Sequence, residues 1–283
     1  MDRSHPKSFS GMTSCVILLF GLFASPPARA RQSASVDSSR TQTAKTISTI
    51  PPGTILPVEL RTTISANRAE TGQTVRGQIA QDVPLPGGSK IRKGSRIEGK
   101  VVDVTAAANG DGHRVSIRFD KLHSNGAVIP VTTALRAIAG FMEVLAAETP
   151  MQSVGESDVF NWMTTIQIGG DAVYGRGGVV TSGQSGQVVG SSLQSGGVLV
   201  QVTANSSGSC RGAINDNHTP QALWVFSSDA CGTYGLSNVH ILHAGRTTPV
   251  GTFTLQVDGQ KAKIHNGDGW LLRVIDGIGV SEE

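Results

Sequence analysis

The sequence lacks an apolar run long enough to cross a membrane near its N-terminus. The run Cys15–Ala24 spans ten residues, whereas a membrane-spanning helix needs about 20. Basic residues precede the run, and Pro26 and Pro27 follow it before the small residues that end at Ala30. This layout predicts a secretory signal, Met1–Ala30, that is cleaved near Ala30, rather than a membrane anchor. We therefore expect a periplasmic or secreted protein of the cell envelope with no transmembrane helix after processing.

Neither sign of charge dominates the sequence. The chain has 24 Lys and Arg against 21 Asp and Glu. The predicted signal contains three of the basic residues (Arg3, Lys7 and Arg29) and one acidic residue (Asp2). Without the signal the count becomes 21 against 20, so the rest of the chain has no overall bias toward nucleic acid or anionic membranes.

Cysteine is also scarce, with 3 residues in the whole chain. Cys15 lies in the predicted signal, which leaves Cys210 and Cys231. An isolated pair in an oxidising compartment predicts a disulfide. A metal-binding or redox pair is the alternative, but these two cysteines lack the C-x-x-C spacing of such sites.

What the sequence does contain favours strands and turns. It has 35 Gly but only 5% aromatic residues, and its apolar stretches are short. Val115, Ile117 and Phe119 alternate with Arg114, Ser116 and Arg118. This period of two is typical of a strand with one buried face. We therefore expect an all-β fold of small barrels or sandwiches, with strands separated by Gly- and Asn-containing turns.

One segment breaks this alternation. Leu135, Ile138, Met142 and Leu145 recur at steps of three and four residues, which predicts a single amphipathic helix over Ala134–Ala147.

These patterns divide the chain into five parts. They are a signal (1–30), a flexible Ser/Thr-rich tether (31–49), a β-barrel domain (50–137), a helix and linker (138–158) and a Gly-rich, disulfide-stabilised β-domain of the sandwich or barrel type (159–283).

Several short motifs occur in the predicted barrel segment. They include Pro52-Gly53-Thr54-Ile55-Leu56, Gly72-Gln73-Thr74-Val75, Ile91-Arg92-Lys93-Gly94-Ser95-Arg96-Ile97-Glu98-Gly99 and Ile129-Pro130-Val131. With these motifs, residues 50–136 resemble the TrbI-like domain, the C-terminal module of bacterial conjugation and type IV secretion channel proteins. The resemblance implies a small β-barrel. In such a barrel Gly53 and Gly94 would permit tight turns, and Gly99 would allow a strong bend or a close backbone approach.

The resemblance does not extend to the whole chain. The channel proteins keep a membrane anchor and a long proline-rich stalk, whereas this sequence has a predicted cleavable signal and a short tether. Residues 160–283 do not match them. The resemblance therefore implies a barrel without implying transport, and the whole chain is also similar to uncharacterised secreted bacterial proteins.

The sequence lacks the common catalytic and nucleotide-binding motifs. It has no G-x-x-x-x-G-K-[ST], H-E-x-x-H or G-x-S-x-G. His240 and His243 lie three residues apart in a predicted strand, which places them on opposite faces and disfavours a shared metal. We therefore assign no catalytic residue, no metal site and no cofactor.

The most distinctive segment surrounds Trp224 and Phe226. Both aromatic residues lie in a predicted strand beside the cysteine pair, with their side chains on the same face. Burial in the core is the simpler interpretation. An aromatic binding surface for glycan or peptide is the alternative.

These observations favour an exported, non-enzymatic envelope protein with a structural or assembly role, whose partners are proteins or further copies of itself. The alternative is a secreted binding module that recognises cell-wall glycan or a protein partner. A secreted hydrolase is the third hypothesis, and it depends only on scattered histidines and carboxylates.

Overall fold

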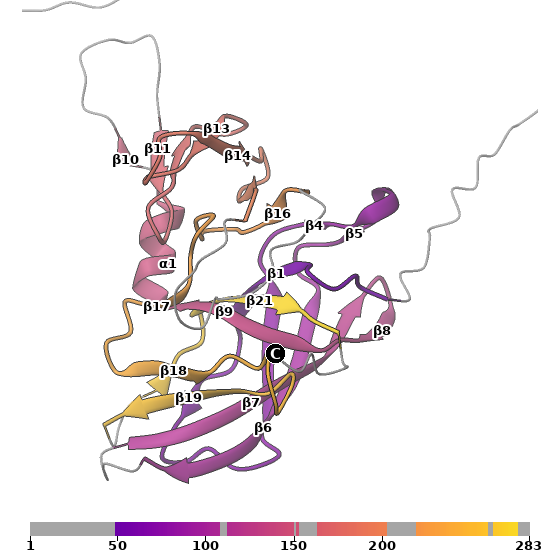
Figure 1. The fold of residues 1–283 in the computed structure, drawn as a ribbon, viewed down its shortest axis with the longest axis vertical. Coiled ribbons are helices and arrows are strands. Elements are labelled where there is room, and N and C mark those ends of the chain that lie inside the picture. The colour runs from indigo at the N-terminus through magenta and orange to yellow at the C-terminus, as the bar shows by residue number, and fades with distance from the viewer. Residues whose placement is uncertain are drawn as a thin grey trace, which may run out of the picture. The chain divides into compact units, whose positions relative to one another are not determined.

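A computed structural model describes residues 49–107, 112–149, 151–152, 163–202, 219–259 and 263–276. All of them lie in one compact unit, Ala44–Glu283. Most of their regular structure is β-strand, accompanied by the short helix α1 (Phe141–Glu148) (Figure 1). The all-β class predicted from the sequence is confirmed.

A ten-stranded, nearly closed sheet, which we call the barrel-like sheet, forms the larger part of this unit. Its strands run in the order β17-β9-β21-β1-β3-β6-β7-β19-β18, with β8 paired to β7. Their bounds are β1 Ile55–Leu60, β3 Thr74–Ile79, β6 Arg96–Ala106, β7 Gly112–Ser124, β8 Ala127–Pro130, β9 Thr133–Ala139, β17 Gly232–Tyr234, β18 Val239–His243, β19 Phe253–Asp258 and β21 Gly269–Val274.

The interior of the barrel-like sheet is apolar, as the alternation in the sequence predicts. Val115, Ile117 and Phe119 of β7 are fully buried. Phe119 packs against Phe253 and Trp270, with ring centroids 6.2 and 5.8 Å away. Burying large aromatic side chains is a major favourable term in folding, so this cluster ties β7, β19 and β21 together.

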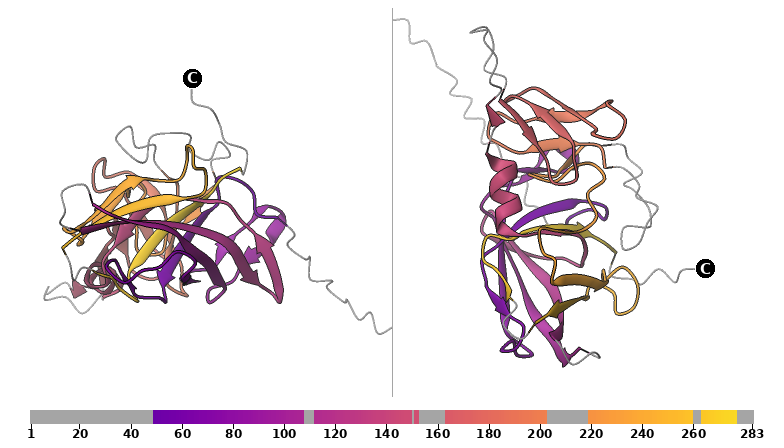
Figure 2. Two further views of the ribbon diagram at one scale, coloured as in Figure 1. Left: turned by 90° about the horizontal axis from the view of Figure 1, so that it is seen from below. Right: turned by 90° about the vertical axis from the view of Figure 1, so that its left-hand side faces the viewer.

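The structure corrects the expected division into two separate β-domains. Four strands of the segment 159–283 belong to the same sheet as the strands of the segment 50–137. In the register, Phe253 of β19 pairs with Ile117 of β7, and Leu271 of β21 lies between Pro57 of β1 and Ala137 of β9. Figure 2 shows these orange and yellow strands among the indigo and magenta ones. Residue patterns reveal strands but not their distant partners, so the sequence alone missed this pairing.

A second, seven-stranded sheet, which we call the small sheet, is antiparallel and runs in sequence order from β10 to β16. Its strands are β10 Met151–Gln152, β11 Met163–Ile166, β12 Ala172–Tyr174, β13 Val179–Thr181, β14 Val188–Ser192, β15 Val198–Val200 and β16 Gln221–Ala222. Two short pairs complete the described strands: β2 (Ile64–Ser65) with β20 (Lys263–Ile264), and β4 (Val83–Pro84) with β5 (Lys90–Ile91), the latter joined through the 3-10 turn η1 (Pro86–Gly88).

The predicted helix over Ala134–Ala147 is wrong in its first half. Residues 133–139 form strand β9, and only residues 141–148 are helical. Every residue of β9 is buried: Leu135 and Ile138 pack in the core of the barrel-like sheet, whereas Ala137 and Ala139 pack in a second core with the small sheet. A strand buried on both faces loses the polar alternation that marks a strand.

Helix α1 leads from β9 toward the small sheet. The buried Asp268 accepts hydrogen bonds from the backbone N–H of Phe141 (2.9 Å) and of His265 (2.7 Å), so its carboxylate caps the first turn of α1. Within the described ranges, no helix has both the length and the apolar character needed to span a membrane.

The three glycines singled out in the sequence have distinct backbone roles. Gly53 and Gly94 have φ values of 86° and 89°, which other residues rarely adopt. At Gly99, a Cβ atom would lie 2.1 Å from the carbonyl oxygen of Arg118. Strand β7 therefore passes so close to β6 that only glycine fits there.

Of the predicted disulfide, Cys231 lies in the described chain, where its backbone N–H donates to the Tyr234 hydroxyl at 3.0 Å. Cys210 lies outside the described residues, as do the predicted signal and most of the tether. The disulfide therefore stays a prediction.

Candidate functional site

A pocket of about 520 Å³ opens beside the small sheet. Its wall combines the C-terminal end of α1, strands β11, β12, β14 and β15, the turns between these strands, and the turn that contains Trp224 and Val225. Lys93, in the turn between β5 and β6, also lines it. The volume lies within the range of about 300–1,000 Å³ that is common for small-molecule sites, so we take this pocket as the candidate site.

Trp224 forms part of the pocket wall in an unusual conformation. The predicted strand over residues 222–226 ends at Ala222, and Trp224 has a φ of 56°. Its indole N–H donates to Glu148 Oε1 at 2.9 Å, which fixes the ring against the end of α1. The side chain is only 6% exposed.

Phe226 is fully buried in the second core, between the small sheet and the barrel-like sheet. Trp224 and Phe226 therefore do not form an exposed aromatic surface, which corrects that alternative. Trp224 instead takes part in the site as a wall of the pocket.

Gln81 positions the turn that carries Trp224. This buried side chain follows β3, and its Oε1 accepts hydrogen bonds from the backbone N–H groups of Trp224 (2.7 Å) and Val198 (3.1 Å). Its Nε2 donates to the carbonyl oxygen of Val198 at 2.7 Å. One side chain of the barrel-like sheet thus holds two segments of the pocket wall.

Glycines leave the pocket open. Gly175, Gly196 and Gly197 line it with φ values of 70°, 89° and 84°, respectively. At Gly197 a Cβ atom would lie 2.3 Å from Gln81 Oε1. The absence of a side chain there allows the turn to approach Gln81.

The charged groups that line the pocket are mainly positive. Lys93 and Arg176 contribute two cations, and neither forms an ion pair with another described residue. Glu148 supplies the one carboxylate among the lining residues, and it is already bonded to Trp224. The arrangement favours a ligand that carries negative charge.

Asp82 holds the backbone of Lys93 in place. Its Oδ1 accepts from the Lys93 backbone N–H at 2.7 Å, and its Oδ2 pairs with Lys90 Nζ at 2.5 Å. The hydrogen bond from Lys90, followed by that from Lys93, lowers the pKa of Asp82. The carboxylate therefore stays ionised over a wide pH range and keeps this corner of the pocket fixed.

Gln167 contributes a polar group with unused hydrogen-bonding capacity. The residue is only 4% exposed and lines the pocket. Its Nε2 donates to the carbonyl oxygen of Trp224 at 3.3 Å, while its Oε1 has no hydrogen-bond partner within the described chain. A buried acceptor without a partner is costly.

The hydroxyl groups that line the pocket belong to Thr165 and Ser192. Among the described lining residues there is no His or Cys. The Ser192 hydroxyl donates to the backbone carbonyl oxygen of Gly175 at 2.7 Å. A serine engaged in this way, with no base beside it, is not activated for attack.

The histidines and acids considered in the sequence do not assemble elsewhere in the described structure. His240 Nε2 lies 3.1 Å from Asp258 Oδ2 in an exposed pair, whereas the ring of His243 contacts the carbonyl oxygen of Thr252. In the part of the chain that the structure describes, no group of three or more His, Cys, Asp or Glu is arranged to hold a metal ion.

The sequence singled out Trp224 but did not reveal Gln81, which holds the pocket wall, or the lining residues Lys93, Glu148, Gln167 and Arg176. They come from five separate segments, and none forms a local motif. The available signal was the set of glycine turns at residues 175–178 and 196–197, which mark places where the backbone bends tightly. Neither the comparison with protein-family models nor the comparison with curated proteins gives a match for this sequence, so the geometry of the pocket carries the functional argument.

Proposed function

We propose that this protein is an exported, non-enzymatic component of the cell envelope that binds a small ligand in the pocket beside Trp224. The observation that carries the proposal is the pocket itself. It has the volume of a ligand site, its strands belong to the small sheet, and Gln81 and Glu148 fix its aromatic wall. Rigid positioning of this kind lowers the entropic cost of binding.

The lining suggests the chemistry of the ligand. Lys93 and Arg176 favour a carboxylate, and the amide of Gln167 offers hydrogen bonding. Val173 and Val198 provide apolar contact. Fragments of cell-wall peptidoglycan combine these features, because they join sugars to short peptides that end in carboxylates. We propose such a fragment as the ligand class.

Binding, rather than hydrolysis, is supported by the state of the polar side chains. The one lining carboxylate, Glu148, bonds to Trp224, and the lining hydroxyl of Ser192 bonds to the backbone. Both side chains help to hold the pocket wall, a role that fits binding without hydrolysis.

The test replaces a small residue of helix α1 with a larger one whose side chain fills the pocket. Ala147 lines the pocket, whereas its neighbour Ala146 is exposed and does not. Muropeptides released from purified cell wall would be titrated into the protein, and binding would be followed by calorimetry. We expect Ala147→Trp to abolish binding and Ala146→Trp, the matched control, to preserve it. Equal affinity for both variants would contradict the proposal.

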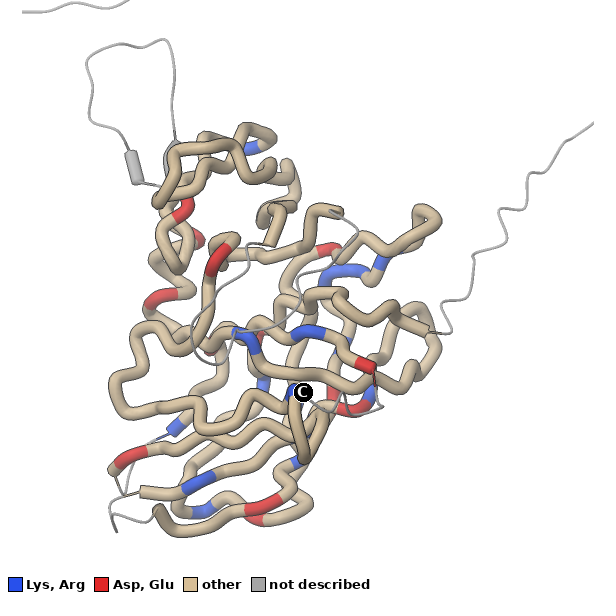
Figure 3. The backbone as a smooth tube through the Cα atoms, in the orientation of Figure 1, with Lys and Arg blue, Asp and Glu red and all other residues tan. Residues whose placement is uncertain are grey.

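A second function, assembly with further copies, is favoured by a separate observation. Ile166, Tyr174, Val179 and Val188 are exposed, and the register of β11–β14 places them on the same face of the small sheet. These strands contain no charged residue, and Figure 3 shows few charges around them (Figure 3). A contiguous exposed apolar area is typical of interaction surfaces.

Self-association is measurable from the solution mass. Val188→Lys places a charge in this face and should shift light-scattering mass toward the monomer. Val128→Lys is the control, because Val128 is also exposed but lies on β8. A wild-type protein that is monomeric at high concentration would exclude self-assembly.

We also propose export through the predicted signal and a relationship of residues 50–136 to TrbI-like domains. The proposal of a relationship is supported by strands β1, β3, β6, β7 and β8, which fall within the segment that carries the resemblance. Intact mass spectrometry of the protein from its native host tests export. The expected N-terminus lies just after Ala30, and a mass that includes Met1 would contradict it.

A further inference from the structure

The outer face of the barrel-like sheet carries an ordered array of positive charges. Strands β3, β6 and β7 are neighbours, and residues that pair across them point to the same side of the sheet. Three rows result, each running from β3 through β6 to β7: Thr74–Lys100–Arg118, Arg76–Glu98–Lys121 and Gln78–Arg96–His123. We call these nine residues the basic face.

The basic face has five Lys or Arg residues, one His and a single carboxylate, Glu98. Over the full lengths of the three strands the balance is six Lys or Arg against three Asp or Glu, because Arg114, Asp103 and Asp120 lie outside the rows. The opposite side of the same strands is apolar and buried. Asp103, which pairs with Ser116, and Asp120 also lie on the solvent side, so that side of the three strands carries six positive against three negative charges.

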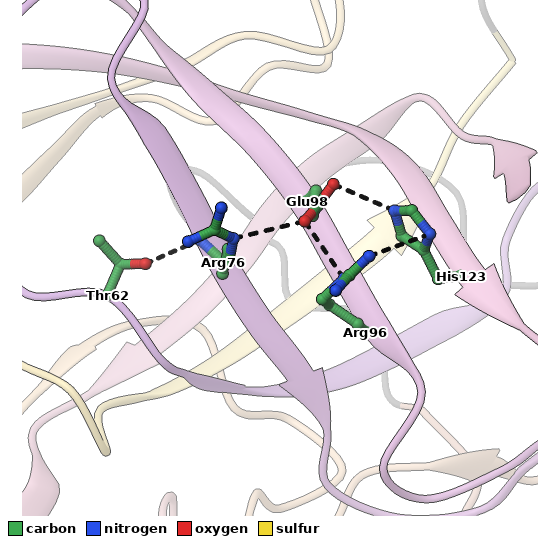
Figure 4. A network of polar contacts seen from close by, with 5 residues as sticks. All are labelled: Thr62, Arg76, Arg96, Glu98 and His123. Atoms are coloured by element: carbon green, nitrogen blue, oxygen red, sulfur yellow. Dashed lines mark hydrogen bonds and ion pairs between the residues drawn. The ribbon is translucent and has the colours of Figure 1, made fainter.

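Glu98 lies at the centre and organises its neighbours. Its Oε1 lies 3.4 Å from Arg76 Nε and 3.2 Å from Arg96 Nε, and its Oε2 lies 3.1 Å from His123 Nε2 (Figure 4). Burial by itself would raise the pKa of Glu98, but the hydrogen bond from His123, the charge of Arg96 and the hydrogen bond from Arg76 outweigh it and lower the pKa. The carboxylate of Glu98 thus contacts the guanidinium groups of Arg76 and Arg96. Its single negative charge balances only one of their two positive charges.

The remaining cations keep their charge available. Lys100 and Lys121 are exposed and form no ion pair with described residues. The guanidinium of Arg118 donates to the hydroxyl of Thr252 at 2.9–3.0 Å, which is a neutral partner. The side chains of Arg76 and Arg96 are 57% and 53% exposed, although both contact Glu98.

We propose that the basic face binds a linear anionic polysaccharide. Neighbouring strands lie about 5 Å apart, and alternate residues of one strand about 7 Å apart, so the cations present a regular grid to a partner with repeating negative groups. The planar guanidinium group of arginine also donates paired hydrogen bonds to the oxygen atoms of carboxylate and sulfate groups. The face is an open sheet surface and shares no residue with the lining of the pocket, so this inference is independent of the function proposed above.

Two other polyanions fit less well. Single-stranded nucleic acid is usually bound by stacking its bases on aromatic side chains, and the nine residues include no Trp, Tyr or Phe. Membrane surfaces are usually bound by side chains that insert into the lipid beside the cations, and the nine residues include no large apolar side chain. A flexible charged sugar chain needs neither feature.

Heparin, a linear sulfated polysaccharide, is the probe for the test, and neutral dextran is the negative control. Binding is measured by calorimetry at low salt and by the salt concentration that elutes the full-length mature protein from a heparin column. We expect the affinity for heparin to fall as salt rises, because salt screens exposed charges, and we expect no binding of dextran.

The variants distinguish a specific effect of the basic face on heparin binding from an effect of the protein's net charge. Lys100→Gln with Lys121→Gln removes two cations that have no structural partner, and it should weaken heparin binding roughly threefold to tenfold. Arg68→Gln with Lys263→Gln removes two exposed cations outside the three rows and should leave affinity within about twofold. Glu98→Gln removes the one acid and should tighten binding about twofold to fivefold.

Circular dichroism and thermal melting establish that each variant is folded before its affinity is compared. Equal weakening by the two double variants would overturn the proposal, because only net charge would then matter. Tighter binding of duplex DNA or of anionic lipid vesicles than of heparin, at the same salt, would overturn the polysaccharide as the partner.

Discussion

At the scale of single residues, the buried Gln81 joins the barrel-like sheet to the small sheet. Its amide makes three hydrogen bonds to backbone groups that lie more than 100 positions away in the sequence. Gln221 makes a similar link, since its Oε1 accepts from the backbone N–H of Ile55 at 3.1 Å. Two glutamines thus fix the relative position of the sheets that form the pocket.

Replacing Gln81 tests this role. Gln81→Leu leaves the backbone N–H groups of Val198 and Trp224 buried without acceptors, and we expect a loss of about 2–4 kcal/mol in the free energy of unfolding. Gln187→Leu is the control, because Gln187 is exposed, and it should change stability by less than about 0.5 kcal/mol. Urea denaturation measures both. Similar values for the two variants would show that Gln81 does not join the sheets energetically.

At the scale of secondary-structure elements, the close approach of neighbouring strands and the capping of α1 by a buried carboxylate decide the local geometry. Strand β6 meets β7 at Gly99, and strand β14 meets β15 at Gly190, where a Cβ atom would again lie 2.1 Å from a carbonyl oxygen. The sequence singled out Gly99 through a motif but gave no such signal for Gly190. Asp268 anchors α1, although it lies 127 residues beyond Phe141.

Gly99→Ala should separate β6 from β7. The added methyl group cannot fit beside Arg118, and overpacking of this kind typically costs about 1–3 kcal/mol. Hydrogen exchange by mass spectrometry would show faster exchange in β6 and β7. Gly88→Ala introduces backbone strain at a φ of 78° in the turn η1 but meets no atom within 4 Å. It should therefore destabilise the protein without selectively exposing these two strands.

Asp268→Asn tests the cap of α1 through its pH dependence. Burial, which outweighs the hydrogen bonds from His265 and Phe141, raises the pKa of Asp268 above its usual 3.8. The folded state therefore favours the protonated carboxyl. This contribution is fully present below the unfolded-state pKa and is lost as the pH rises through the folded-state pKa.

The stability of the wild type relative to Asp268→Asn should thus decrease as the pH rises from about 3.8 toward neutrality. Chemical denaturation at several pH values measures the difference between the two proteins. A difference that grows with rising pH would mean that the hydrogen bonds to Asp268 outweigh its burial.

At the scale of the whole molecule, two cores share strands β1, β9 and β21. One side of these strands fills the barrel-like sheet, and the other side, with residues such as Ile55, Ala137 and Leu271, packs in the second core with the small sheet. The chain reaches this arrangement only when its C-terminal strands return to pair with β1, β7 and β9. The described sheets are therefore interdependent parts of one compact unit.

A truncation tests this interdependence. A fragment of residues 44–150 retains β1, β3 and β6–β9 but lacks β17–β19 and β21, so β1, β7 and β9 lose pairing partners and apolar cover. We expect no cooperative thermal transition and rapid proteolysis of the fragment, whereas residues 44–283 should melt cooperatively. A stably folded fragment would instead support an independent N-terminal barrel.

The sequence by itself determined the all-β class and identified strand β7 by its alternation. An edge or surface strand with one wet face must alternate apolar and polar residues, and β7 does so throughout its central part. The sequence also marked Gly53, Gly94 and Gly99, because only glycine tolerates the backbone geometry at these positions.

Only the tertiary structure decided the pairing of strands, the strand conformation of residues 133–139 and the composition of the pocket. Strand partners are chosen by complementary surfaces far apart in the chain, and burial on both faces removes the alternation that identifies a strand. The pocket depends on both effects. Its polar residues come from segments that meet only after Gln81 and the C-terminal strands have brought the two sheets together.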